Sequence, residues 1–77
     1  MAQPAQNERN WERIGANVRQ RRKQTGMSQE DLAFATGLSP KTIGRMERGE
    51  GGQQTDTLID IARALSVWSG ELLRGVK

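Results

Sequence analysis

The sequence predicts an all-α domain built from five short helices. Apolar residues recur three, four or seven positions apart in successive blocks, which is the spacing of one face of a helix. Most blocks begin near Ser, Thr, Asn or Pro and are followed by Gly, the usual order of helix start and stop signals. No segment is predicted to be a strand. The 77 residues suffice for one small core, so a single compact domain is expected.

The first expected helix follows a polar N-terminal segment. Residues 1–9 show no apolar periodicity and are expected to form a disordered arm, so that the folded domain spans residues 10–77. Asn10 is the predicted N-cap, and Gly26 is expected to end the helix just after Thr25. The inner stripe of this helix is predicted to consist of Trp11, Ile14, Val18 and the stem of Arg22.

Two helices joined by a tight turn are expected within residues 29–48. Ser28 opens a Ser-Gln-Glu-Asp sequence typical of a capping box, and Gly37 supplies a left-handed residue that ends the helix. A second start signal, Ser-Pro, follows at residues 39–40, and Gly49 closes the next helix. So short a turn excludes an antiparallel pair and predicts a steep crossing. The predicted inner faces carry Leu32, Ala33, Ile43 and Met46.

The remaining elements are shorter. Residues 50–54 are expected to form a flexible loop, after which Thr55 or Thr57 caps a fourth helix. The core face of that helix is predicted to hold Leu58, Ile61, Ala62 and Leu65. A bend is expected over residues 66–70, followed by a short last helix with Leu72 and Leu73.

The composition favours a binding protein over an enzyme. The net charge of +3 and the pI of about 10.2 suit a polyanionic partner without identifying one. The absence of His and Cys removes the usual neutral general base, thiol nucleophile and zinc ligands, so neither a cofactor nor a metal is expected. Gly44 and Gly49 have the spacing of a phosphate-binding loop, but Glu50 stands where that motif needs Lys.

The composition also bears on localisation. Because no cysteine, signal peptide or long apolar span is present, a cytoplasmic protein that does not enter a membrane is expected.

The third helix has the most informative surface. At 3.6 residues per turn, burial of Ile43 and Met46 turns Lys41 and Arg45 outward. Gly44 lies on that outer side and costs about 1 kcal/mol relative to Ala in a helix interior. Two interpretations stay open: Gly44 is tolerated or permits a tight helix contact, or its bare surface lets the helix sit deeper in a groove between the two cationic side chains.

The sequence resembles the lambda-repressor-like (Xre/Cro-type) helix-turn-helix family over about residues 11–74. The likeness rests on Gln29, Leu32, Ala33, Gly37, Leu38, Ile43 and Met46, on the following Glu47-Arg48-Gly49, and on the downstream LIDIARALSV. The resemblance implies a five-helix DNA-binding domain whose third helix enters the major groove of double-stranded DNA.

The resemblance also implies roles for individual residues. The base-reading set would be Pro40, Lys41, Gly44 and Arg45. The phosphate-contacting set would be Gln29, Ser39, Thr42, Arg48, Gly51 and Gly52. For Arg48, a plain interaction with the helix dipole is the alternative. Arg22 and Glu47 would form a partly buried ion pair that serves structure and does not contact DNA.

The expected function is therefore sequence-specific transcription regulation, most plausibly repression, by a nucleoid-associated protein of a bacterium or its phage. A dimer on a palindromic operator is expected, and its candidate contact surface comprises Trp68, Leu72, Leu73 and Val76. Trp68 either packs under the last helix or lies exposed in that contact. The alternative function is an antitoxin, or another helix-turn-helix module that binds a toxin or other protein partner.

Overall fold

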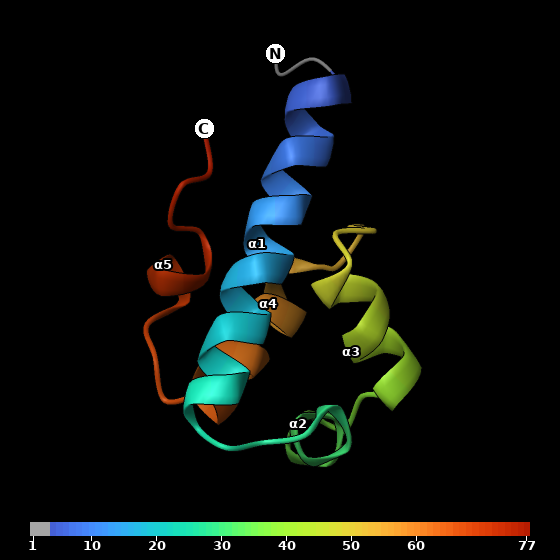
Figure 1. Cartoon of the computed structure of the whole chain (residues 1–77), viewed down its shortest axis with the longest axis vertical. Helices are drawn as coiled ribbons and strands as arrows, with labels where there is room; N and C mark the ends of the chain where they lie inside the picture. Colours follow the sequence, from blue (N-terminus) through green and yellow to red (C-terminus); the bar gives the residue numbers. More distant parts are fainter. Residues whose placement is uncertain (1–3) are drawn as a thin grey trace.

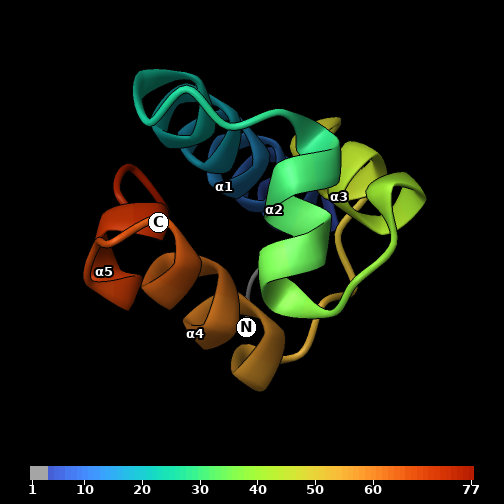
Figure 2. The same cartoon turned by 90° about the horizontal axis from the view of Figure 1, so that it is seen from below.

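The computed structural model describes residues 4–77, with side chains described from residue 6 onward. The helices in this range are α1 (Pro4–Gln24), α2 (Gln29–Thr36), α3 (Pro40–Glu47), α4 (Thr55–Ala64) and α5 (Ser69–Leu72). Figure 1 shows that α1 is the longest helix and that α3 and α5 lie on opposite sides of it. Seen from below in Figure 2, the helices surround a common centre. The prediction of an all-α, five-helix fold is confirmed.

One apolar core joins all five helices. Its buried members are Ile14, Val18, Leu32, Ala33, Ile43, Met46, Ile61, Ala62, Leu65 and Leu72. Trp11 and Leu58 are half-buried and pack against its edge. Since burying one Leu or Ile side chain stabilises a fold by about 1.5–3 kcal/mol, this core is the main source of stability. The inner faces expected from helical periodicity are confirmed.

The start and stop signals around α2 and α3 act as predicted. The Ser28 hydroxyl accepts a hydrogen bond from the Asp31 amide, and the Asp31 carboxylate accepts one from the Ser28 amide, both at 2.9 Å. The Ser39 hydroxyl accepts from the Thr42 amide at 3.1 Å, with Pro40 as the first helical residue. Gly37 adopts a left-handed φ of +74° at the end of α2. The Ser28 bonds fix the start of α2, while Gly37 and the Ser39 cap define the turn between α2 and α3.

The predicted start of the first helix is wrong. Helix α1 already includes residues 4–9, which had been assigned to the arm, while residues 1–3 lie outside the described range. Pro is favourable at a first helical position, and the following residues are mostly good helix formers. The Asn10 side chain does not cap the helix. Instead it donates to the Lys77 carbonyl at 2.9 Å and accepts from the Lys77 amide at 3.0 Å, which ties α1 to the C-terminus.

The last two helices also begin differently from expectation. Gln54 is the N-cap of α4 and makes no side-chain cap bond, whereas Thr55 and Thr57 are already helical. Helix α5 is a single turn that starts within the expected bend. Its Leu72 is buried, while Leu73 is 44% exposed just after the helix. The short helix thus contributes one side chain to the core.

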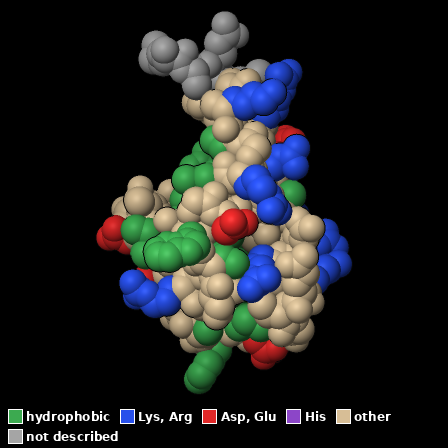
Figure 3. Space-filling model, turned by 90° about the vertical axis from the view of Figure 1, so that its left-hand side faces the viewer, with side chains coloured by type: hydrophobic (Ala, Val, Ile, Leu, Met, Phe, Trp, Pro, Cys, Tyr) green, Lys and Arg blue, Asp and Glu red, His purple; other side chains and the backbone are tan. Residues whose placement is uncertain are grey.

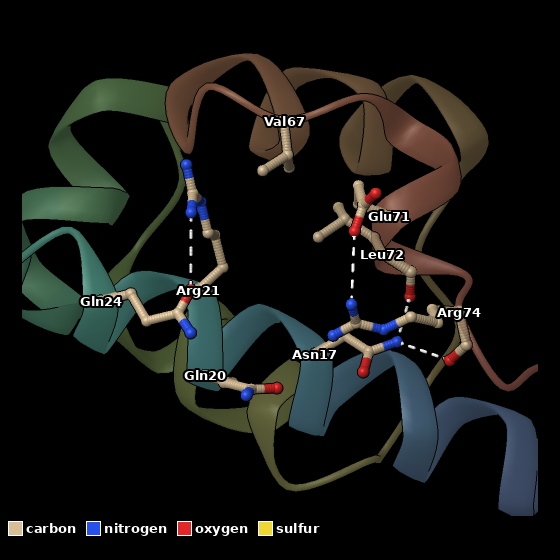
Figure 4. A pocket seen from close by; sticks show the side chains of 8 residues that line it. All are labelled: Asn17, Gln20, Arg21, Gln24, Val67, Glu71, Leu72 and Arg74. Atoms are coloured by element: carbon tan, nitrogen blue, oxygen red, sulfur yellow. Dashed lines mark hydrogen bonds and ion pairs between the residues drawn. The ribbon is translucent and has the colours of Figure 1, made fainter.

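A buried asparagine holds α5 against α1. The Asn17 side-chain amide donates to the carbonyls of Leu72 at 2.9 Å and Arg74 at 2.8 Å, as Figure 4 shows. Asn17 is only 7% exposed, so these bonds satisfy a polar group that would be costly to bury alone. The polar hollow in Figure 4 lies beside this contact. Helical periodicity does not identify Asn17, because it marks only the apolar residues of this face.

A glycine sets the distance between α1 and α3. Gly15 is buried, and a Cβ atom there would clash with the Met46 carbonyl oxygen and lie 2.9 Å from the Glu47 carbonyl oxygen. Both obstacles are backbone atoms, which cannot rotate away as a side chain would. The end of α3 therefore lies directly against the α1 backbone, in a contact that any larger residue would push apart.

A buried ion pair fixes the same end of α3. Arg22 Nε and Nη2 donate to the two Glu47 carboxylate oxygens at 2.6 and 3.0 Å, and the side chains are 10% and 3% exposed. Arg22 Nη1 also donates to the Met27 carbonyl at 2.9 Å, and Gln29 Nε2 donates to Glu47 at 3.1 Å. This network joins α1, the following turn, α2 and α3. It contains the ion pair that the family resemblance implied.

The hydrogen bonds decide the ionisation of Glu47. Burial alone would raise the pKa of its carboxyl, but the bonds from Arg22 and Gln29 and the nearby Arg charges outweigh burial and hold the pKa below its ordinary value of 4.5. Glu47 is therefore a carboxylate at neutral pH.

The Gly15 contact predicts that Gly15→Ala lowers the free energy of unfolding by about 1–3 kcal/mol, although Ala is the better helix former. Chemical denaturation monitored by circular dichroism measures the change. Gly70→Ala is the matched control, because Gly70 is helical and nothing lies within 4 Å of its Cβ position. Equal stability of Gly15→Ala and wild type would contradict the close approach.

The ion pair predicts that Glu47→Ala destabilises the domain by about 3–5 kcal/mol, because Arg22 is left buried without its partner. That loss approaches the whole stability of a small domain. Thermal melting should show it, while Glu8→Ala, which removes an exposed carboxylate on the same helix as Arg22, should melt like wild type. A variant that melted normally but lost DNA specificity would contradict a structural role.

The ion pair also predicts a loss of stability in acid. Since the folded-state pKa of Glu47 is depressed, its contribution is complete above pH 4.5 and disappears as the pH falls through the lower folded-state value. Melting temperatures measured from neutral pH to about pH 3 should fall in that window. The Glu8→Ala control should follow the same profile. A melting temperature that did not change with pH would contradict the contribution of the ion pair to stability.

Candidate nucleic-acid interface

Helix α3 presents cationic side chains on its outer face. Ile43 and Met46 are 0% and 1% exposed, whereas the Lys41 side chain is exposed. The side chains of Arg45 and Arg48 are 57% and 64% exposed. Burial of the apolar pair thus turns Lys41 and Arg45 away from the core, as helical periodicity predicted, and Arg48, the C-cap residue, is exposed as well. Pro40, also exposed, begins the same helix.

Gly44 does not form the bare surface patch of one of the two interpretations left open by the sequence. The residue is buried, and a Cβ atom there would lie 3.1 Å from Arg48 Nη1 and 3.7 Å from Gln29 Oε1. The Gln29 side chain reaches past Gly44 to bond Glu47 and, together with Arg48, covers it. The interpretation of Gly44 as an open patch is therefore wrong for the free protein, and the close-contact interpretation agrees with the structure.

Several members of the expected phosphate-contacting set already have partners within the protein. Gln29 donates to Glu47 at 3.1 Å. The Ser39 and Thr42 hydroxyls lie 3.0 Å apart and share a hydrogen bond at the start of α3. Ser39 is exposed and Thr42 is half-buried, and both lie at the N-terminal end of α3.

The glycines after α3 turn the chain back toward α1. Gly51 and Gly52 have φ angles of +74° and +83°, a region that favours glycine. A Cβ atom on Gly51 would lie 2.6 Å from the Trp11 ring, so the glycine packs directly on the indole. Trp11, expected only as part of the core stripe, therefore also positions the loop that follows α3.

Glu50 is a member of this surface that sequence analysis missed. Its Oε1 accepts from Arg45 Nε at 3.3 Å, and its Oε2 accepts from Arg48 Nε at 3.0 Å. These hydrogen bonds from Arg48 and Arg45 lower the pKa of the Glu50 carboxyl. Next to Glu50 and its two arginine partners is a hollow lined by Thr42, Arg45, Glu50, Gly51 and Gln53. Glu50 was recognised only as an acid unsuited to a phosphate loop.

Hydrophobic side chains reach the surface away from α3. Trp68 is 86% exposed and Leu73 is 44% exposed, so Trp68 does not pack under the last helix. Leu72 is buried, and Val76 is half-buried against the core, so the expected contact surface shrinks to Trp68, Leu73 and the edge of Val76. Figure 3 views the face that carries α5 and shows hydrophobic side chains among basic ones.

Other kinds of site are not found in the part of the chain that the structure describes. Residues 4–77 contain no group of three His, Cys, Asp or Glu side chains that could hold a metal ion. None of the helices in this range is both long enough and apolar enough to cross a membrane.

Comparison with known proteins agrees with this arrangement. The HTH_3 helix-turn-helix family model matches residues 18–67, well over half of the chain. The HTH-type transcriptional regulator y4dJ of Sinorhizobium fredii, itself uncharacterized, is 32% identical over 60 residues, which cover 78% of each chain. The restriction-modification controller protein C.AhdI of Aeromonas hydrophila is 33% identical with a TM-score of 0.80, and the match covers 83% of this chain and 97% of C.AhdI.

The same fold also forms part of a longer protein of another kind. The crystal structure of Fe(II) HppE in complex with substrate matches at 32% identity and a TM-score of 0.76. That match covers 80% of this chain but only 36% of HppE, so the likeness is to one portion of that protein. From the matched residues and the shared helical arrangement, the chain belongs to the HTH_3 helix-turn-helix family, a family of DNA-binding transcription regulators.

Proposed function

We propose that this protein is a sequence-specific regulator that inserts α3 into the major groove of double-stranded DNA. The observation that carries the proposal is the division of α3 into a buried Ile43/Met46 side and an outer side bearing Lys41 and Arg45. An α-helix fits the major groove, where the pattern of donors and acceptors distinguishes all four base pairs. The short helix and its exposed cations suit that groove in size and in charge.

The base-reading roles follow from side-chain chemistry. The Arg45 guanidinium suits a bidentate contact to guanine O6 and N7, and the Lys41 ammonium suits the same acceptors. Pro40 has no N–H donor and offers only apolar contact, as to a thymine methyl. Gly44 leaves room for the Gln29 and Arg48 side chains that cover it in the free protein, and its part in the interface requires both to move aside.

The phosphate roles surround this face. Arg48 and the hydroxyl of Thr42 flank the outer side of α3. The start of α3 offers the Lys41 backbone amide at the positive end of its dipole, because Pro40 has no N–H and the Thr42 amide donates to Ser39. Ser39 lies at that start, and the amides of Gly51 and Gly52 are proposed to contact phosphates beyond the other end. Gln29 would exchange its bond to Glu47 for one to a phosphate, or share its amide between them. Such contacts set register without reading sequence.

A dimer on a palindromic operator would give the selectivity that one domain lacks, because a single module reads only a few base pairs. Trp68 and Leu73, both exposed and at the two ends of α5, support a contact between two copies at the α5 face. Repression is the proposed outcome, since a dimer bound over a promoter excludes other proteins. Selection from randomised duplexes tests the dimer: an inverted repeat supports it, and a single uninterrupted site contradicts it.

Removal of Arg45 and removal of Arg48 should have different effects. Arg45→Ala should abolish preference at one base position, worth about 1–3 kcal/mol of discrimination, with other positions unchanged. Arg48→Ala should weaken all duplexes about equally and reduce the dependence of log affinity on log salt concentration by about 0.9. Binding titrations at several salt concentrations, against the selected duplex and its single-base variants, measure both effects.

Arg63→Ala is the matched control, because Arg63 is an exposed arginine on α4 that pairs with Asp60 at 3.8 Å. It should leave base preference unchanged. The rival proposal of an antitoxin, whose main partner is a toxin protein, predicts that Lys41→Ala and Arg45→Ala leave function intact. Retained function in those variants, or no preferred duplex at moderate salt, would overturn the proposal.

A further inference from the structure

The cationic face of α3 contains its own counter-charge. Gly49, with a φ of +80°, turns the chain at the end of α3, and the Glu50 amide then donates to the Arg45 carbonyl at 3.1 Å. This backbone bond holds Glu50 across the end of the helix. Its carboxylate accepts from the Nε atoms of Arg45 and Arg48 at 3.3 and 3.0 Å. One acid therefore bridges two cations that the proposed function assigns to DNA.

The bridge leaves most donors of each arginine free. A guanidinium has five N–H donors, and Glu50 engages only the one on Nε. A bidentate contact to guanine needs two donors, which the Nη atoms supply. Arg45 can therefore keep its bond to Glu50 while it reads a base. With Nε anchored, its guanidinium also has fewer orientations to lose on binding.

The effect on phosphates is different. Binding to an arbitrary duplex depends on cations that neutralise phosphates, with little help from base contacts. Glu50 cancels one positive charge on this face, and its side chain is 46% exposed, so its carboxylate also faces any phosphate that approaches the two arginines. The same group thus opposes charge-driven binding while it leaves base reading possible.

We infer that Glu50 is a specificity-determining residue, which holds the Arg45 guanidinium in position for base reading and weakens binding to arbitrary DNA. The inference rests on the proposed function. Glu50 belongs to neither the expected base-reading set nor the expected phosphate-contacting set. The inference nevertheless gives it a part in the choice between DNA sites. Because exposed ion pairs contribute little to stability, removal of Glu50 should leave the fold intact.

Glu50→Gln tests this inference, because it removes the charge and nearly preserves the shape. Two duplexes serve as probes: the best-bound duplex from selection on a randomised library with the wild-type protein, and a scrambled duplex of the same length and base composition. The variant should bind the scrambled duplex up to about eightfold more tightly near 0.1 M salt, with a salt dependence steeper by about 0.9. The selected duplex should gain less, so the ratio of the two affinities falls.

Asp60→Asn is the matched control. Asp60 is also an exposed acid paired with an arginine, Arg63 at 3.8 Å, but it lies on α4, outside α3 and outside the proposed contact at α5. This substitution changes the net charge equally and should leave the affinity ratio unchanged. In an Arg45→Ala/Arg48→Ala background, Glu50→Gln should likewise leave the ratio unchanged. Melting temperatures of all variants verify folding.

The outcomes separate the two proposals. If wild type prefers the selected duplex but Glu50→Gln has the same ratio, or if Asp60→Asn lowers the ratio as much, the inference about Glu50 is wrong and the proposed function stands. If wild type prefers no duplex, the proposed function fails and the inference fails with it.

Discussion

The position of α3 depends on the buried pair of Arg22 and Glu47. Three hydrogen bonds converge on the Glu47 carboxylate, two from Arg22 on α1 and one from Gln29 on α2. Such a pair adds little net stability compared with a well-packed apolar contact, but separating its members leaves a charge stranded in the interior. The pair therefore restricts the arrangements of α1, α2 and α3 that the domain can adopt, and it determines where the outer face of α3 points.

Close backbone contacts add a second restraint that acts by shape. Gly15 lets the carbonyls at the end of α3 lie against α1, and Gly51 lets the next loop lie on the Trp11 ring. The first contact involves the carbonyl of Glu47 itself, and the second lies just beyond the end of α3. The C-terminal end of α3 is thus held by charge, by backbone packing and by an aromatic ring. Its start is held by the Ser39 cap and by the turn that Gly37 permits.

The sequence predicted what depends on neighbours along the chain. Helical spacing identified the buried faces, and Ser28, Gly37 and Ser39 marked the helix ends, because capping acts within about one turn. It failed where distant segments decide the outcome. Asn10 looked like a cap but bonds the chain end 67 residues away. Asn17 and Gly15 gave no periodic signal. Their contacts are with backbone carbonyl groups of distant residues, which come near only when the chain has folded. Gly44 shares a side with the exposed cations, but the Gln29 side chain from another helix covers it.

Two glutamates three positions apart show how burial changes the effect of the same interaction, an ion pair with arginine. Glu47 and Glu50 both accept hydrogen bonds from arginines, and the pKa of each is lowered. At Glu47 the pair is shielded from water, so its attraction is strong and specific in direction. At Glu50 water and salt screen the pair, and its carboxylate alters the charge of a surface instead of fixing a fold. The sharp turn at Gly49 separates the two environments, because it carries the chain from the inner side of α3 at Glu47 to the outer side at Glu50, three residues later.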